Sequence, residues 1–192
     1  MAVKNILVVG VGGQGVIMAS DMLADVALAS GFDAKKSEVH GMSQRGGVVS
    51  SHVRYGQNIS SPLISAGEAD LLIAFELAEA VRWLNFAKRE AQVIANSQKV
   101  VPPLVSMGMA QYPAQAQDLI TNSCGTAYII DAQQMAAELG NPRLVNTILL
   151  GLASNYLDPT LDKWQEVIEK RMKPTLREIN HKAFAAGRAL AS

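Results

Sequence analysis

The sequence predicts an α/β protein: a three-layer α/β/α Rossmann-like sandwich with a mainly parallel sheet, an inserted β-hairpin and a helical C-terminal extension. Two observations predict it. Short apolar runs typical of buried strands alternate with stretches of helical spacing, and a glycine-rich turn, GVGGQG, joins the first run to the first helix. The chain has 192 residues, 49% of them apolar, so it can bury a sizeable core. We therefore expect one domain over residues 1–192.

The first elements form a strand–helix–strand unit. The run NILVV at 5–9 suits a central parallel strand, and the glycine turn follows it directly. Residues 16–30 carry apolar side chains at helical spacing, and Gly31 is placed to end that helix. Residues 33–39 (DAKKSEV) are more polar and predict a second strand near an edge of the sheet.

A β-hairpin is expected next. Its first arm at 48–55 alternates in polarity, GQN forms its turn, and its second arm covers 59–64. Pro62 cannot donate to a ladder, so this second arm should lie at an edge.

The remaining segments continue the α/β alternation. Strands are expected at 71–75, 91–97 and 126–131, and helices at 76–86, 131–139, 142–157 and 160–190, the last broken near Pro174. The helical extension covers about 142–192. Its helix at 142–157 carries an apolar stripe that predicts core packing, with a subunit interface as the alternative; the stripe comprises Leu144, Ile148, Leu149 and Leu152.

Composition excludes several classes of function. The formal net charge is zero, which argues against a nucleic-acid surface because phosphate binding needs a basic excess. No run approaches the ~18 apolar residues of a membrane span, so we expect no membrane partner and a cytoplasmic protein. The single cysteine, Cys124, cannot hold an iron–sulfur cluster alone, and TNSCGTA offers it no base. We expect it to pack as a small hydrophobe.

The turn GVGGQG has the spacing of a dinucleotide-binding loop, with Gly10, Gly12, Gly13, Gln14 and Gly15 as candidate binding residues. Its glycines allow close backbone approach, and free N–H groups at the helix start attract phosphate. Glu38 lies about twenty residues further on, where nicotinamide sites keep an acid for the ribose. A nicotinamide or other nucleotide module is therefore one interpretation.

The stretch SEVHGMSQRGG at 37–47 favours a second interpretation. It offers a forked guanidinium, amide and hydroxyl donors and flexible backbone, all suited to an anion at the carboxyl end of the sheet. The candidate binding residues here are Ser37, His40, Gly41, Ser43, Gln44, Arg45, Gly46 and Gly47. A glycine-rich turn that only feeds the hairpin is the plainer alternative.

No set of catalytic groups can be singled out. The three histidines, His40, His52 and His181, lack metal-ligand spacing, so no metal site is expected on this chain. His40 is expected to shape its loop by hydrogen bonding to backbone.

The motifs GVGGQGV, SEVHGMSQRGGVVSSHVR, SPLI and GEADLLIAFE together resemble the γ-type subunit or domain of 2-oxoacid:ferredoxin oxidoreductases. Within that family, SEVHGMSQRGG followed by SHVR and GEAD most resembles the β subunit of indolepyruvate:ferredoxin oxidoreductase. The resemblance covers about residues 5–85, and γ subunits acting on pyruvate, 2-oxoisovalerate or 2-oxoglutarate are the alternatives within the family.

The resemblance implies oxidative decarboxylation of an aryl 2-oxoacid to an acyl-CoA, carbon dioxide and reduced ferredoxin. Thiamine diphosphate, Mg²⁺ and 4Fe-4S clusters would belong to a large partner subunit, through which ferredoxin is also reached. This chain lacks the G-D-G…N pattern that holds thiamine diphosphate. It would bind no cofactor alone, and the 10–15 and 37–47 segments would form one wall of a shared cleft that meets coenzyme A or the substrate carboxylate.

Overall fold

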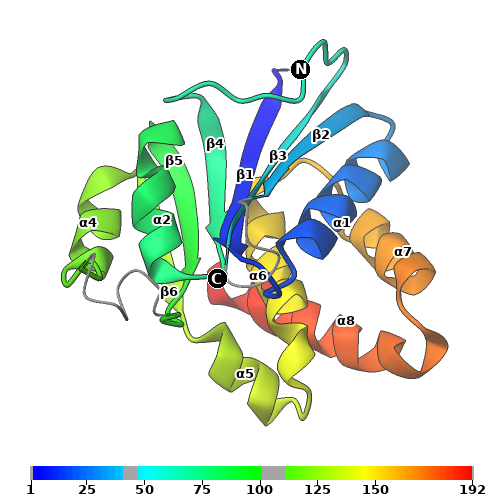
Figure 1. Cartoon of the computed structure of the whole chain (residues 1–192). Coiled ribbons are helices and arrows are strands. Elements are labelled where there is room, and N and C mark those ends of the chain that lie inside the picture. The colour runs from blue at the N-terminus through cyan, green and yellow to red at the C-terminus, as the bar shows by residue number, and fades with distance from the viewer. Residues whose placement is uncertain (1, 41–46, 101–110, 192) are drawn as a thin grey trace.

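A computed structural model describes residues 2–40, 47–100 and 111–191. Its core is a six-stranded sheet with the order β2-β3-β1-β4-β5-β6 (Figure 1). The strands are β1 (Lys4–Val11), β2 (Asp33–His40), β3 (Val48–Gly56), β4 (Ala69–Ala74), β5 (Ala87–Asn96) and β6 (Thr126–Ile130). The α-helices are α1 (Val16–Ala29), α2 (Leu77–Trp83), α4 (Ala116–Ser123), α5 (Ala132–Glu138), α6 (Val145–Ala153), α7 (Leu161–Arg171) and α8 (Pro174–Arg188). Single 3₁₀ turns cover Leu84–Phe86, Pro142–Leu144, Ser154–Tyr156 and Ala189–Ala191.

The sheet is mainly parallel, as predicted. β1, β4, β5 and β6 pair in parallel, whereas β3 runs antiparallel to both of its neighbours, β1 and β2. β2 therefore runs in the same direction as β1, but β3 lies between them. Since neighbouring strands are about 4.8 Å apart, β2 is about 10 Å from β1 instead of beside it.

The predicted hairpin pairs differently from the expectation. The antiparallel partner of β3 is β2, with His52 opposite Ser37, and residues 59–64 form no strand. The physical reason is that β1 and β2 already occupy both edges of β3, so no edge was left for a second arm. Side chains fasten the 59–64 segment instead. Arg54 donates to the carbonyl of Ser61 at 2.8 Å, and the ring Nδ1 of His52 accepts from the backbone N–H of Ile64 at 3.1 Å.

Helices cover both faces of the sheet (Figure 1). Side chains of β1 alternate between the two resulting cores. Ile6 and Val8 point into the larger core, to which α1, α6, α7 and α8 contribute, and Leu7 and Val9 point into the smaller core under α2 and α4. All nine residues of α6 are buried, so the apolar stripe of the predicted 142–157 helix is core packing.

The C-terminal helices form part of the main helical layer and are not an appendage to it. α6 and α8 approach so closely that a Cβ on Gly187 would lie 2.0 Å from the carbonyl oxygen of Ile148. The helix α4 was not predicted. Only Ala116 and Ile120 of its eight residues are buried, which leaves too weak a periodic signal in the sequence.

Candidate anion-binding cleft at the carboxyl edge of the sheet

The glycine turn is built by two different constraints. Gly13 and Gly15 have positive φ angles of 98° and 92°, a conformation that residues with a Cβ rarely adopt. Gly10 instead permits close packing, because a Cβ there would lie 2.8–2.9 Å from side-chain atoms of Gln14, Phe75 and Val16. The space around Gly13 is open, so its constraint is conformational and not steric.

The structure brings the glycine turn and the end of the 37–47 stretch together. The backbone N–H of Gly12 donates to the carbonyl of Gly47 at 2.9 Å, just before β3 begins. His40 ends β2 opposite Val49. Ser37 lies opposite His52 within the sheet and does not line the cleft. The candidates Gly41, Ser43, Gln44, Arg45 and Gly46 lie outside the described residues.

A cleft of about 780 Å³ opens at the carboxyl edge, beside the glycine turn. Its walls come from the first turns of three helical runs. Residues 13–15 precede α1, residues 141–146 open the run that becomes α6, and Lys173 precedes α8. No side chain among the described residues caps α1 or α8. The positive ends of these helices therefore face the cleft with free N–H groups, an arrangement that attracts anions.

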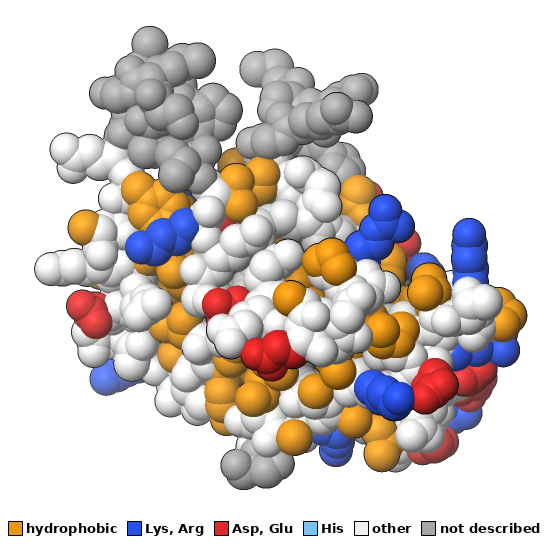
Figure 2. All heavy atoms as spheres, turned by 90° about the horizontal axis from the view of Figure 1, so that it is seen from below, with side chains coloured by type: hydrophobic (Ala, Val, Ile, Leu, Met, Phe, Trp, Pro, Cys, Tyr) orange, Lys and Arg blue, Asp and Glu red, His pale blue; other side chains and the backbone are white. Residues whose placement is uncertain are grey.

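Cationic side chains reinforce that field. Arg143 and Lys173 both line the cleft, are exposed, and form no ion pair with any residue in the described part of the chain. Arg171 also lines it, but its guanidinium pairs with Asp25 at 2.5 Å and Asp21 at 3.6 Å. Figure 2 views the molecule from below, the side of the carboxyl edge, where Lys and Arg side chains stand mostly towards the periphery.

Asn146, on the first turn of α6, adds a second kind of signal. Only 6% of the residue is exposed, yet its amide makes no hydrogen bond within the described part of the chain. Its Nδ2 lies 2.7 Å from the position that a Cβ on Gly15 would occupy. Because Asn146 lines the cleft, its amide can bond to a ligand oxygen or to water there.

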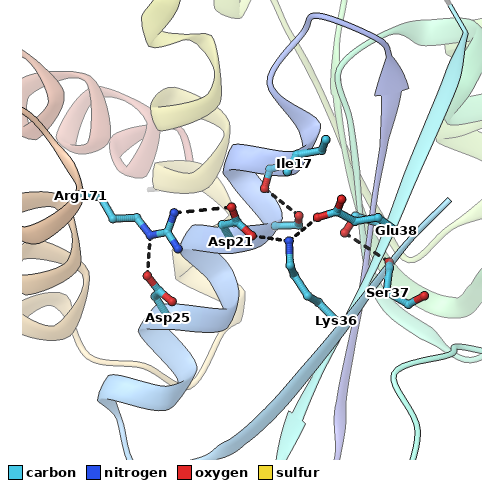
Figure 3. Close-up of polar contacts among 9 residues, drawn as sticks. Ile17, Asp21, Asp25, Lys36, Ser37, Glu38 and Arg171 are labelled. Atoms are coloured by element: carbon cyan, nitrogen blue, oxygen red, sulfur yellow. Dashed lines mark hydrogen bonds and ion pairs between the residues drawn. The ribbon is translucent and has the colours of Figure 1, made fainter. Parts of the chain in front are cut away.

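The acid of the nicotinamide interpretation has another role. Glu38 pairs with Lys36, which in turn contacts Asp21 on α1, and the chain of charges continues through Asp21 to Arg171 on α7 (Figure 3). Hydrogen bonds to these carboxylates raise the pKa of Lys36 despite its partial burial. A nicotinamide-ribose site needs its acid on the strand next to β1, but here β3 lies between β1 and β2, the strand that carries Glu38. Glu38 is therefore not placed to bind a ribose at the glycine turn.

Cys124 packs as the sequence predicted. Cys124 is half-buried against the smaller core, donates from Sγ to the carbonyl of Ile120 at 3.3 Å, and has its pKa raised by burial. It is a packing residue. Within residues 2–40, 47–100 and 111–191, no cluster of His, Cys, Asp and Glu could hold a metal ion. In those same ranges no helix has the length and apolarity needed to span a bilayer.

Sequence reasoning missed the C-terminal half of the cleft, including Arg143, Asn146 and Lys173. A signal existed: Asn141-Pro142 and Lys173-Pro174 each place a proline at the start of a helical run. What the sequence could not tell is that these starts meet the glycine turn. The resulting arrangement suits an anion, and the described residues that line it include no acid–base or nucleophilic set.

Fold and cleft together define an open α/β protein with a candidate anion-binding cleft at the carboxyl edge of its sheet. The pyruvate ferredoxin/flavodoxin oxidoreductase family model matches residues 5–190, and the chain belongs to that family. It is 36% identical over 188 residues to the indolepyruvate oxidoreductase subunit IorB of Thermococcus kodakarensis, covering 95% of this chain and 93% of that protein.

Solved structures share the fold. The gamma subunit of a keto/oxoacid ferredoxin oxidoreductase from Geobacter sulfurreducens aligns with a TM-score of 0.74 at 21% identity, covering 98% of this chain and 99% of that one. A 2-oxoglutarate:ferredoxin oxidoreductase from Magnetococcus marinus, solved with 2-oxoglutarate, coenzyme A and succinyl-CoA bound, aligns with a TM-score of 0.76 at 21% identity. That match covers all of this chain and 31% of the larger one.

Proposed function

We propose that this chain is the small subunit of an indolepyruvate:ferredoxin oxidoreductase, which converts an aryl 2-oxoacid and coenzyme A into an acyl-CoA, carbon dioxide and reduced ferredoxin. Relatives named as indolepyruvate oxidoreductase subunits are 36% identical to this chain, whereas a 2-oxoglutarate synthase subunit is 26% identical over a similar length, which supports this assignment over the 2-oxoglutarate enzyme. The observation that carries the chain's own role is the cationic cleft at the glycine turn.

The chemistry of carbon and electrons belongs to a large partner subunit in this proposal. Thiamine diphosphate, Mg²⁺ and 4Fe-4S clusters would reside there. The small subunit would contribute one wall of the active-site cleft, and ferredoxin would dock through the partner. The sequence supports this division, because one cysteine cannot ligate a cluster.

Coenzyme A is the ligand that the cleft suits best. Its diphosphate and 3′-phosphate groups carry several negative charges, whereas the 2-oxoacid has a single carboxylate. Arg143 and Lys173, which form no ion pair among the described residues, and the starts of three helical runs make a stronger positive field than one carboxylate needs. We therefore assign the cleft to the phosphate-bearing end of coenzyme A.

The assignment is tested by co-expressing the chain with its large partner and measuring dye reduction with a panel of 2-oxoacids. Indolepyruvate should give the highest kcat/KM, and another preferred acid would move the assignment to that enzyme. An NAD titration of the chain alone tests the nucleotide-module alternative. A micromolar Kd, equivalent to about −8 kcal/mol, would favour that alternative.

The ligand of the cleft is tested by Arg143→Gln and Lys173→Gln in the assembled enzyme. Each removes one cation, so we expect the KM for coenzyme A to rise by roughly 10-fold or more, with the KM for indolepyruvate unchanged. Lys170→Ala is the control, because Lys170 is exposed on α7 and does not line the cleft. A rise confined to the KM for the 2-oxoacid would contradict the coenzyme A assignment.

A further inference from the structure

A chain of side-chain amides beside the glycine turn ends in an unused hydrogen-bond donor. The backbone N–H of Val11 donates to Oε1 of Gln14 at 2.7 Å. The Nε2 of Gln14 then donates to the carbonyl of Phe75 and to Oε1 of Gln98, both at 3.2 Å.

The direction of every amide in this chain is fixed. A backbone N–H can only donate, so Gln14 must turn its oxygen towards Val11 and its nitrogen towards Gln98. Gln98 must then accept through its oxygen, which directs its Nε2 elsewhere. Gln98 lines the cleft, and its Nε2 has no partner in the described part of the chain.

The backbone of Gln98 is also held in place. Its carbonyl accepts from the N–H of Leu77 at 3.4 Å, and Glu76, just before α2, accepts from the N–H of Val100 at 3.2 Å. Glu76 is 1% exposed, forms no ion pair within the described residues, and also accepts from the Tyr112 hydroxyl and from the N–H of Glu79. The Glu76 side chain therefore links the start of α2 to Val100, two residues after Gln98, and to Tyr112.

We propose that Gln98 positions the ligand of the cleft by donating its Nε2–H to a phosphate oxygen of coenzyme A. Gln14 sets the direction of the Gln98 amide, and Glu76 fixes the position of its backbone. This inference rests on the proposed function, because it takes coenzyme A as the ligand. It also gives a reason for a long polar side chain at Gln14 in a turn built mostly of glycines, because the Gln14 amide links the turn to Phe75 and Gln98.

The test is Gln98→Glu in the assembled complex, with binding of coenzyme A measured by calorimetry. The substitution preserves shape and the bond from Gln14, but replaces the donor by a charged acceptor. We expect the Kd for coenzyme A to rise at least about tenfold at pH 8.

Gln133→Glu is the matched control. Gln133 lines the same cleft from α5, and its replacement by glutamate introduces the same charge. Its side-chain amide makes no hydrogen bond to any residue that the structure describes. Its effect should be clearly smaller than that of Gln98→Glu. Equal effects of the two substitutions would overturn the proposal, since they would show only a general response of the cleft to charge.

Glu76→Gln tests the positioning separately. In this variant an NH₂ group replaces one of the two carboxylate oxygens of residue 76, and an NH₂ group cannot accept a hydrogen bond. Either Val100 or Glu79 therefore loses its acceptor, and the backbone of Gln98 is held less firmly. We expect a raised Kd for coenzyme A with the complex intact; an unchanged Kd would remove Glu76 from the scheme.

If the wild-type complex binds coenzyme A and oxidises indolepyruvate, but Gln98→Glu binds normally, only this inference fails. A wild-type complex without that activity would instead refute the proposed function.

Discussion

Substituting Gly15 by alanine separates the two constraints that shape the glycine turn. At Gly15 the positive φ of 92° is combined with a steric conflict, because the new Cβ would lie 2.7 Å from Nδ2 of Asn146. At Gly13 the φ of 98° is similar, but nothing lies within 4 Å of a new Cβ. Gly13→Ala is therefore a matched control that measures the conformational cost alone.

The expected magnitudes differ accordingly. Left-handed backbone costs a residue with a Cβ about 1–2 kcal/mol, which should be the whole destabilisation in Gly13→Ala. Crowding a packed site adds about 1–3 kcal/mol, so Gly15→Ala should lose roughly 2–5 kcal/mol. Removing the crowding partner in Gly15→Ala/Asn146→Ala should return the cost towards that of Gly13→Ala.

The assay is urea denaturation of the purified chain, followed through the fluorescence of the buried Trp164. Asn146→Ala alone should change the free energy of unfolding little, since the amide it removes has no hydrogen-bond partner in the described residues. If Gly15→Ala costs no more than Gly13→Ala, or if Asn146→Ala gives no relief, the steric contact between position 15 and the Asn146 amide is refuted.

Four further predictions follow from particular residues. Gly187→Ala should destabilise the chain by about 3 kcal/mol or more, because its Cβ would meet the carbonyl of Ile148; a normal urea midpoint would contradict the α6–α8 contact. Burial lowers the pKa of His52 below its ordinary 6.5, and the neutral ring accepts from Ile64. The unfolded chain thus binds more protons between the lowered pKa and 6.5, so stability is full above about pH 6.5 and falls on acidification through that window. His52→Gln should flatten this dependence, as pH-resolved denaturation would reveal. Arg45→Ala should lower kcat/KM by roughly 10- to 150-fold while the partner still co-purifies; dissociation with normal turnover of the remaining complex would make it an interface residue. The chain purified alone should reduce no dye with any 2-oxoacid, even with thiamine diphosphate and Mg²⁺ added, and activity there would refute the division between subunits.

The order of strands and helices could be predicted because it depends on local signals. Runs such as NILVV are apolar on both faces, as a strand buried under two helical layers must be. The end of α1 was equally clear, since Gly31 has a φ of 84° that few other residues adopt. The resemblance carried by 37–47 and the glycine turn also identified the family, which the comparisons confirmed.

The pairing of β3 and the composition of the cleft were decided only by the tertiary structure. Periodicity shows that 48–56 is a strand but cannot tell which strands will flank it. One of its two partners, β1, lies at the start of the chain, with β2 and α1 between them in the sequence. In the same way, the prolines at 142 and 174 mark helix starts without showing that they converge on Gly15. An anion site built from distant helix ends depends on packing between residues more than one hundred positions apart, such as Gly15 and Asn146. Local sequence patterns cannot predict which of these distant residues will come into contact.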